Sequence, residues 1–364
     1  MRSSATFPEA TASFVRMSRR AGERFDLIQA GGGNTSVKHG DGTMLIKASG
    51  VQLSEVTENS GYSRVDLAAV LALLDDPTLA AIPDKRERDA VATKRLLACA
   101  TDQGSRPSIE TFLHAVLDRF TLHTHPLVVN IAACRSDWKE TLAKAVGGDA
   151  VFVPYGTPGL ELALLLKRAV DDAVRERGRK PQVLFLQNHG LITSGDDADE
   201  AGDATERVCA ALEKAFGLDL ERFKLTNRIS LLVNDGGSGV VSYLSCDADL
   251  AALVKDHRQL LFTAPFCPDG MVYCGPTAVE IMSLDDRDPV TRYVEQYGEL
   301  PRVVLFGEKL FFTGASVRKA REAEEVCKFQ LMTLAAAGSS ACSLNAEELR
   351  YLGNWEAEQY RRKK

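Results

Sequence analysis

The segment FTLHTHP, residues 120–126, is the stretch that best predicts both the fold and a site. Its first three residues favour a β-strand, and the proline at its end closes the run. Side chains alternate between the two faces of a strand, so His123 and His125 are expected on the same face, about 7 Å apart. Two imidazoles placed in this way can bind one cation, although His-x-His is also an ordinary pattern on a half-buried strand face.

Two further residues could complete a metal site with this pair. His189 lies in the segment LFLQNHGLITSG (184–195), and Glu110 follows Pro107-Ser108 in a segment with helical character. Three histidines and a glutamate suit a divalent ion of borderline softness, zinc first. Alternatively, Ser108 is the N-cap of a helix, and Glu110 is an acid of its first turn that the helix dipole favours.

Length and composition indicate the class of protein. The chain has 364 residues, enough for two domains, with 45% hydrophobic and 26% charged residues. The net charge of −6 argues against a general binder of nucleic acid or of anionic membranes. No apolar run is long enough to cross a bilayer, and the N-terminus lacks the apolar core of a signal peptide. The eight scattered cysteines include no CxxC pair, which favours free thiols in a reducing cytoplasm.

A glycine-rich loop, GGGNTS (31–36), forms a second candidate site. Glycines allow the backbone to turn several N–H groups toward one point, and such nests hold anions. The spacing matches neither a P-loop nor a dinucleotide-binding motif, and a simple hairpin turn remains the alternative. A later turn, ASG (48–50), offers another hydroxyl and N–H. The candidate donors in these two turns are Gly33, Asn34, Ser36, Ser49 and Gly50.

The remaining patterns mix helices and strands with short connections. Helical spacing is found at 6–24, 160–176 and 198–217, and strands are predicted at 27–29, 44–47, 183–187 and 191–193. This mixture predicts a layered α/β or α+β domain.

The C-terminal third repeats the middle of the chain imperfectly. The segment 153–162 is similar to 272–281, 184–195 to 303–314, and 120–126 to 262–268. These pairings place Pro265, Cys267 and Glu308 where the first copy has His123, His125 and His189. We therefore expect a catalytic domain at 1–232 and, at 233–364, a partial repeat without the metal ligands, although a chance match of apolar strands is the alternative.

Five motifs together resemble those of the class II aldolase and adducin family, in the family's order and with similar spacing. The resemblance covers roughly residues 10–225, and NWEAEQYR (354–361) is similar to the aldolase part of bifunctional rhamnulose-phosphate aldolase/dehydrogenases. The matching motifs are GGGNTS (31–36), ASG (48–50), PSIE (107–110), HTHP (123–126) and NHG (188–190).

The resemblance implies a three-layer α/β/α domain with a central, mostly antiparallel sheet. The internal repeat adds the expectation of a smaller, degenerate α/β module at the C-terminal end. The resemblance further implies that zinc, or else manganese or cobalt, is bound by His123, His125 and His189, with Glu110 as a fourth ligand or as the acid/base. It also implies a phosphate site at Gly33, Asn34, Ser36, Ser49, Gly50 and Ser108. Ile109 departs from this pattern, because several relatives carry a serine there that donates to the phosphate. Relatives are usually tetramers, so a homo-oligomer is expected.

The implied activity is that of a class II aldolase, which cleaves or forms a C–C bond in a ketose phosphate through a metal-stabilised enediolate. Glutamate at position 110 favours this reaction over epimerisation, because the similar epimerases carry aspartate there. A sugar-phosphate 4-epimerase and a decarboxylase of a 3-oxo-sugar-acid phosphate remain alternatives on the same scaffold. A non-catalytic, adducin-like scaffold is a third, but such a protein is expected to lose its metal ligands.

Overall fold

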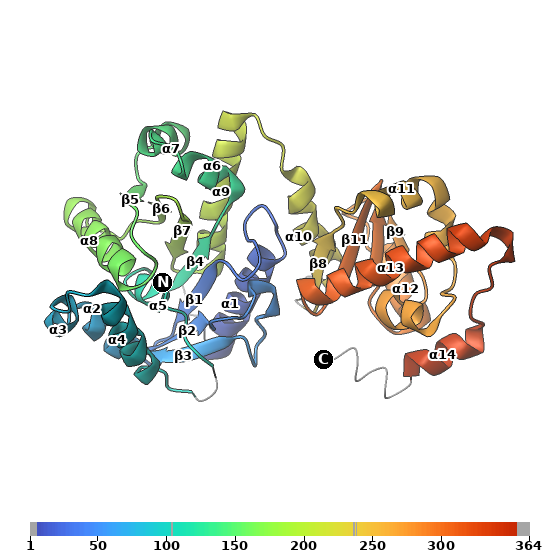
Figure 1. The fold of residues 1–364 in the computed structure, drawn as a ribbon, viewed down its shortest axis with the longest axis horizontal. Helices are drawn as coiled ribbons and strands as arrows, with labels where there is room; N and C mark the ends of the chain where they lie inside the picture. Colours follow the sequence, from blue (N-terminus) through green and yellow to red (C-terminus); the bar gives the residue numbers. More distant parts are fainter. Residues whose placement is uncertain (1–5, 103–104, 236, 238, 355–364) are drawn as a thin grey trace. The chain divides into compact units, whose positions relative to one another are not determined.

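A computed structural model of the chain describes residues 6–102, 105–235, 237 and 239–354 (Figure 1). The chain forms two compact units, Met1–Leu220 and Glu221–Lys364. The boundary therefore precedes helix α10 (Glu221–Asn234), whereas the sequence analysis placed it after residue 232, inside this helix. The difference arises because α10 packs on β8 (Val241–Leu244), the first strand of the second unit. Most of the motif at 354–361 lies outside the described residues.

The first unit is built on a seven-stranded sheet with the order β3-β2-β1-β4-β7-β6-β5. All neighbouring strands are antiparallel except β5 and β6, which are parallel. The strand with the two histidines, β4, lies at the centre of this order, as expected for a segment that is buried along its whole length. The strands are β1 (Asn34–Lys38), β2 (Thr43–Lys47), β3 (Tyr62–Asp66), β4 (Phe120–Thr124), β5 (Val151–Val153), β6 (Val183–Leu186) and β7 (Gly190–Gly195).

Helices cover both faces of this sheet, which confirms the predicted three-layer arrangement (Figure 1). One layer contains α1 (Phe7–Gly22) and α9 (Ala198–Phe216). Helices α6 (Leu127–Ala133) and α7 (Trp138–Val146) pack on α9, and the short helical turn Leu53–Glu55 packs on α1. The other layer shares a large apolar core with the sheet. Its helices are α2 (Leu67–Leu74), α3 (Pro77–Ala80), α4 (Lys85–Ala98), α5 (Thr111–Ala115) and α8 (Leu160–Arg177).

The segment before β1 was predicted as a strand at residues 27–29, and this prediction is wrong. Its backbone pairs with the segment that follows β4 instead of with a neighbouring strand. The carbonyl of Leu27 accepts a hydrogen bond from the N–H of His125 (2.9 Å), and that of Asp26 accepts one from Leu127 (2.9 Å). The loop at 24–33 is thus held beside the second histidine of FTLHTHP.

The second unit contains a four-stranded sheet with the order β8-β11-β10-β9, in which β9 (Val279–Ile281) is parallel to β10 (Val303–Phe306) and β11 (Lys309–Gly314) is antiparallel to both of its neighbours. Helices α11 (Ala248–His257) and α13 (Val317–Ala337) share an apolar core with the strands, and α12 (Asp288–Tyr297) contacts β9. The remaining elements are α14 (Ala346–Asn354) and short helical turns at Arg258–Phe262, Gly270–Cys274 and Gly338–Ser340.

This sheet has the same strand order and directions as β4-β7-β6-β5 of the first unit. The registers, however, correct most of the pairings made from the sequence. His123 lies opposite Ile192, and Leu244 lies opposite Phe311 at the same place in the second sheet. Leu244, not Pro265, therefore stands at the position of His123, and by the same register Cys246 stands at that of His125.

The second copy of FTLHTHP is thus the strand β8 and not residues 262–268, whose similarity to it is fortuitous. Likewise β9, at 279–281, corresponds to β5 at 151–153, so the match of 272–281 to 153–162 is out of register. The pairing of Glu308 with His189 agrees with the register of β11.

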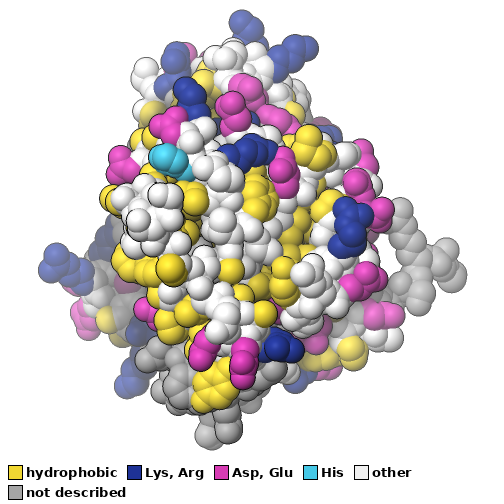
Figure 2. Space-filling model, turned by 90° about the vertical axis from the view of Figure 1, so that its right-hand side faces the viewer, with side chains coloured by type: hydrophobic (Ala, Val, Ile, Leu, Met, Phe, Trp, Pro, Cys, Tyr) yellow, Lys and Arg dark blue, Asp and Glu magenta, His cyan; other side chains and the backbone are white. Residues whose placement is uncertain are grey.

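Two surface observations complete the description. None of the helices that the structure describes is both long and apolar enough to cross a bilayer. On the face drawn in Figure 2, basic and acidic side chains are interspersed among hydrophobic and uncharged ones. A charged ligand on such a face has to be recognised by a local arrangement of side chains and not by a field of one sign.

Candidate metal centre

The three histidines converge at the end of β4. The Nε2 atom of His123 lies 3.2 Å from Nε2 of His189 and 3.2 Å from Nε2 of His125. Among the described residues these three form the one group of His, Cys, Asp or Glu side chains whose potential ligand atoms gather closely enough to hold a metal ion. His123 is fully buried, and the other two rings are partly exposed. This triad could bind a metal.

Glu110 adds a carboxylate to the triad. Its Oε1 lies 3.4 Å from Nε2 of His123 and 3.5 Å from Nε2 of His189. Its Oε2 accepts a hydrogen bond of 3.3 Å from the side-chain amide of Asn34. Asn34 lies opposite His123 in the sheet, so both side chains point toward the layer that contains α5.

The local structure around Glu110 corrects one prediction. Helix α5 begins at Thr111, so Glu110 itself is the N-cap and Ser108 lies two residues earlier. The hydroxyl of Ser108 accepts a hydrogen bond from the N–H of Glu110 (3.3 Å), and its carbonyl accepts one from Thr111 (3.0 Å). The Glu110 side chain caps no helix N–H, which leaves both of its oxygens for the site.

Backbone contacts orient the histidines. Nδ1 of His123 lies 3.0 Å from the carbonyl oxygen of Leu191, so this nitrogen carries the proton and Nε2 presents its lone pair to the site. Asn188, which precedes the third histidine, has a left-handed backbone conformation with φ of 53°. Asparagine tolerates this conformation well, and it allows the tight turn between β6 and β7 that presents His189.

Two glycines of the sequence motifs are needed because the backbone passes close to His125. A Cβ atom at Gly32 would lie 2.8 Å from Nδ1 of His125. A Cβ at Gly190 would lie 2.3 Å from the carbonyl oxygen of Thr124 and 3.0 Å from the His125 ring. The glycines therefore serve close packing around a metal-type ligand, a role that the sequence analysis did not assign to them.

We expect Gly32→Ala to weaken metal binding about 10- to 100-fold, because the new methyl group would displace the His125 ring. The matched control is Gly31→Ala in the same loop, where a Cβ would meet nothing within 4 Å. Zinc affinity measured by competition with a chromogenic chelator tests the pair. Equal affinities in the two variants would contradict the steric explanation.

The donor atoms fit a tetrahedral ion. Zinc binds imidazole nitrogen and carboxylate oxygen at about 2.0–2.2 Å, so ligand atoms at the corners of a tetrahedron lie about 3.3 Å apart. The separations of 3.2, 3.2, 3.4 and 3.5 Å, which are four of the six edges of such a tetrahedron, match this length. Without a cation, the lone pairs of neutral imidazoles would face one another at these distances, and two lone pairs form no stabilising contact.

The electrostatics agree with a site for a cation. Burial, together with the neighbouring His123 and His189, lowers the pKa of His125 to about 3, so this ring is neutral. Burial acts to raise the pKa of Glu110, but the adjacent His123 and His189 outweigh it and hold the pKa well below its usual value. Neutral imidazoles and an ionised carboxylate are the forms that bind a metal.

The predicted phosphate-binding turns lie beside one another. Ala48 forms a β-bridge with Pro107, and the N–H of Ser49 donates to the carbonyl of Arg106 (2.8 Å). Ser49 and Gly50, both exposed, are thereby brought next to Ser108. Ile109 packs against the apolar core instead of facing these turns.

The two other predicted donors have structural contacts. Gly33 has φ of 70°, and a Cβ there would lie 2.9 Å from the carbonyl oxygen of His123, so this glycine also serves close packing. Ser36 is a correction: it is fully buried, and its hydroxyl lies 2.8 Å from Nδ1 of the buried His114. It points into the core and cannot contact a substrate.

Lys47 is a residue of the site that the sequence analysis missed. It ends β2, is only 4% exposed, and donates hydrogen bonds to the carbonyls of Gly31 (3.3 Å) and Val51 (2.8 Å). It thus ties the glycine-rich loop to the ASG turn. Burial lowers its pKa, and the negative charges of Glu110 and Glu55 oppose this shift. The sequence feature that could have indicated this role is the position of the lysine, directly before the predicted phosphate-binding turn ASG.

Comparison with known proteins gives matches to the first unit. Residues 12–216 match the family model described as Class II Aldolase and Adducin N-terminal domain. The chain is 26% identical over 220 residues to YuxG of Bacillus subtilis, named an uncharacterized oxidoreductase; the match covers 58% of this chain but only 30% of that protein's length.

Two solved structures are each similar to more than half of the chain. One is the N-terminal class II aldolase domain of a conserved protein from Thermoplasma acidophilum, with 26% identity, a TM-score of 0.48, and coverage of 59% of this chain and 97% of that one. The other is L-fuculose-1-phosphate aldolase from Thermus thermophilus, with 20% identity, a TM-score of 0.34, and coverage of 57% and 94%.

Proposed function

Because the chain belongs to the class II aldolase and adducin family, we propose that it is a zinc-dependent aldolase that cleaves or forms a C–C bond in a ketose phosphate. The observation that carries the proposal is the convergence of three imidazole Nε2 atoms and one carboxylate oxygen, each 3.2–3.5 Å from Nε2 of His123 or His189. A scaffold protein without catalysis would have no need to keep this set.

The metal would be held by His123, His125, His189 and, in the absence of substrate, Glu110. A bound divalent cation would supply a Lewis acid for the negative charge that develops on the substrate's carbonyl oxygen during cleavage. Nitrogen-rich ligand sets favour zinc over magnesium or calcium, with manganese and cobalt as the other candidates.

Glu110 is the residue we assign to proton transfer. Asn34 donates to its Oε2 and thereby fixes the carboxylate, while Oε1 faces the imidazoles. In the cleavage direction, the carboxylate takes the proton of the substrate hydroxyl whose carbon becomes the aldehyde, the C–C bond breaks and leaves its electron pair on the carbon next to the carbonyl, and the carboxyl group returns the proton to that carbon. The synthetic direction is the reverse of these steps. A positioned carboxylate in this role contributes about 10²- to 10⁴-fold to the rate.

We assign the phosphate group of the substrate to the adjoining turns at 31–34, 48–50 and 108. Ser49 and Ser108 supply hydroxyls, and Lys47 supplies a buried positive charge beside the loops. The ammonium group of Lys47 can take the place of the hydroxyl that Ile109 does not provide. A charge-assisted hydrogen bond to phosphate is stronger than one from a neutral donor.

Lys47→Met should therefore lower kcat/KM for a ketose phosphate about 10- to 100-fold, because one charged hydrogen bond is lost. The same substitution should change the rate with the unphosphorylated ketose much less. Steady-state kinetics with the two substrates tests the assignment. An equal loss for both would mean that Lys47 only holds the loops together.

The aldolase proposal is tested with a panel of ketose 1-phosphates and the zinc-loaded protein. We expect release of dihydroxyacetone phosphate and an aldehyde such as lactaldehyde, detected by coupled reduction. Formation of an epimer or of CO2 without any aldehyde would instead assign the site to the epimerase or decarboxylase chemistry of the same scaffold.

Two further proposals accompany this function. All eight cysteines are free thiols, which supports the expectation of a reducing compartment such as the cytoplasm. A homo-oligomer remains a prediction, which light scattering after size-exclusion chromatography would test.

A further inference from the structure

The repeat in the second unit allows its residues to be compared position by position with those of the first. The N–H of Ser194 donates to the carbonyl of Gln182 (3.0 Å), and that of Thr313 donates to the carbonyl of Arg302 (3.0 Å) at the same place in the second sheet. Arg302, directly before β10, is thus the counterpart of Gln182, directly before β6.

The helices that follow the hairpins correspond in the same way. The side chain of Asp197 caps α9 by accepting from the N–H of Glu200 (2.8 Å), and Ser316 caps α13 by accepting from the N–H of Lys319 (3.3 Å). Lys319 is therefore the counterpart of Glu200. At these two positions the second unit has exchanged a neutral and an acidic side chain for two cations.

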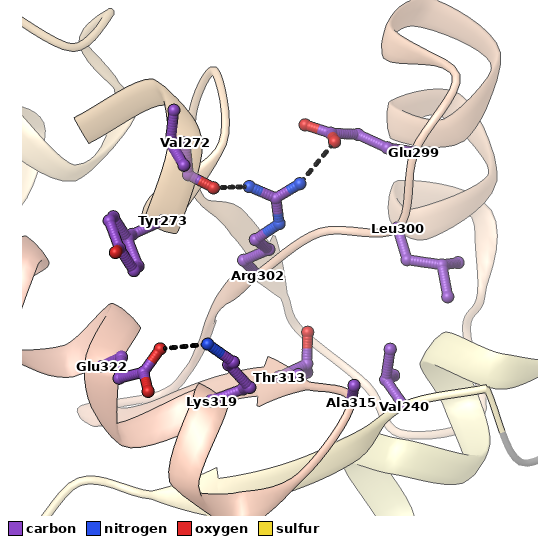
Figure 3. Close-up of a pocket in the computed structure, with 11 residues that line it drawn as sticks. Val240, Val272, Tyr273, Glu299, Leu300, Arg302, Thr313, Ala315, Lys319 and Glu322 are labelled. Carbon is purple, nitrogen blue, oxygen red and sulfur yellow. Dashed lines mark hydrogen bonds and ion pairs between the residues drawn. The ribbon is translucent and has the colours of Figure 1, made fainter. Parts of the chain in front are cut away.

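Both cations face one cavity of about 290 Å³ in the second unit (Figure 3). Figure 3 shows the guanidinium of Arg302 directed toward Glu299 and the carbonyl of Val272, and the ammonium group of Lys319 directed toward Glu322, with the Tyr273 ring on one wall. Leu300 and Val240 lie on the opposite wall. A pocket of this size and composition suits a small metabolite with one apolar part.

Two carboxylates accompany the cations. Nη2 of Arg302 lies 2.6 Å from Glu299, and Nζ of Lys319 lies 2.8 Å from Glu322. The four side chains are only 19–34% exposed. Ion pairs between residues three apart in the sequence contribute little to the free energy of unfolding. A contribution to stability therefore does not explain why two such pairs line the same cavity. Lys319 keeps two ammonium hydrogens beyond its bond to Glu322, and these can serve a ligand.

We propose that this cavity binds a free α-amino acid with an apolar side chain. Its carboxylate would be held between Arg302 and Lys319, and its ammonium group by Glu299 or Glu322. Its side chain would lie against the apolar wall formed by Val240 and Leu300. A zwitterion matches a cavity that has two charges of each sign, whereas a simple anion would leave both carboxylates without a new partner. All of the lining residues belong to the second unit, so none of them is a residue of the metal centre.

The test uses the full chain and three probes, L-valine, L-leucine and L-phenylalanine, in calorimetric and thermal-shift titrations up to about 10 mM. We expect at least one of them to bind and to raise the melting temperature. For that amino acid, the N-acetyl derivative lacks the ammonium group and the amide lacks the carboxylate. Each should bind at least about tenfold more weakly, because each loses a charged hydrogen bond.

Arg302→Gln, which restores the residue of the first unit, and Lys319→Gln should each weaken binding at least about tenfold. Arg292→Gln is the matched control, since Arg292 is exposed on α12 and lies outside the lining of the cavity. Arg302 also holds the carbonyl of Val272 and could be needed for folding. The Lys319 ammonium group, in contrast, pairs with Glu322 alone among the described residues. Lys319→Gln is therefore expected to fold, and it tests the proposal even if Arg302→Gln does not fold.

Three results would overturn the proposal. They are no binding of any of the three amino acids to the native chain, equal binding of the N-acetyl derivative, and unchanged binding in Lys319→Gln.

Discussion

Replacing His123 by alanine is expected to remove the bound metal ion and to lower turnover by about 10³-fold or more, since a catalytic metal supplies several kcal/mol of stabilisation. The effect should exceed that at the other ligands, because Nε2 of His123 is the atom that approaches His125, His189 and Glu110 together. Metal content by atomic emission and the rate of retro-aldol cleavage measure the two losses.

The control for this variant is His257→Ala, which removes a histidine from α11 in the second unit. It should bind about as much metal as the native chain. His123 is fully buried, so a melting curve of the metal-free proteins is needed to separate loss of the ligand from unfolding. A folded His123→Ala protein with one zinc per chain would contradict the assignment.

Glu110→Gln is expected to lower kcat about 10²- to 10⁴-fold while most of the metal remains bound. The three imidazoles are untouched by this change, whereas the group that moves the proton is lost. The amide has nearly the same shape as the carboxylate, so Asn34 and the turn before α5 should stay in place. Single-turnover kinetics with metal-loaded protein gives the rate of the chemical step.

Glu140→Gln, at an exposed position of α7, is the matched control and should leave kcat unchanged. If Glu110→Gln lost metal and activity in parallel, Glu110 would be a ligand without a role in proton transfer. If activity persisted with full metal content, another residue would be the base.

Much of the first unit could be predicted from local sequence. The alternation in FTLHTHP predicted β4 and a common side for both histidines, and the apolar periodicity of 160–176 and 198–217 predicted α8 and α9. These features follow from the periods of strand and helix alone. The convergence of His123 with Glu110 required the order of strands in the sheet, which the family resemblance supplied and local patterns did not.

What was missed depended on contacts between distant segments. Ser36 belongs to the GGGNTS motif, but its place in β1 opposite Thr121 turns its hydroxyl into the core toward His114. Lys47 became part of the site only because the chain folds the loops at 31 and 51 over its ammonium group. Neither outcome can be read from residue types within one segment.

The second unit shows the same limit. The sequence similarity of 262–268 to 120–126 suggested a second copy of the histidine strand. The register of a strand is set by its pairing, and the segment that pairs with β11 is Val241–Leu244. The hairpin of β10 and β11, in contrast, was found correctly in outline, because its strand and turn residues are contiguous.

The metal centre is tested most directly by diffraction from crystals of the zinc-loaded full chain, with data collected on both sides of the zinc absorption edge. We predict one anomalous peak about 2.0–2.2 Å from Nε2 of His123, His125 and His189 and from a Glu110 oxygen. A zinc peak elsewhere in the chain, with the three imidazoles bound to no ion, would contradict the account.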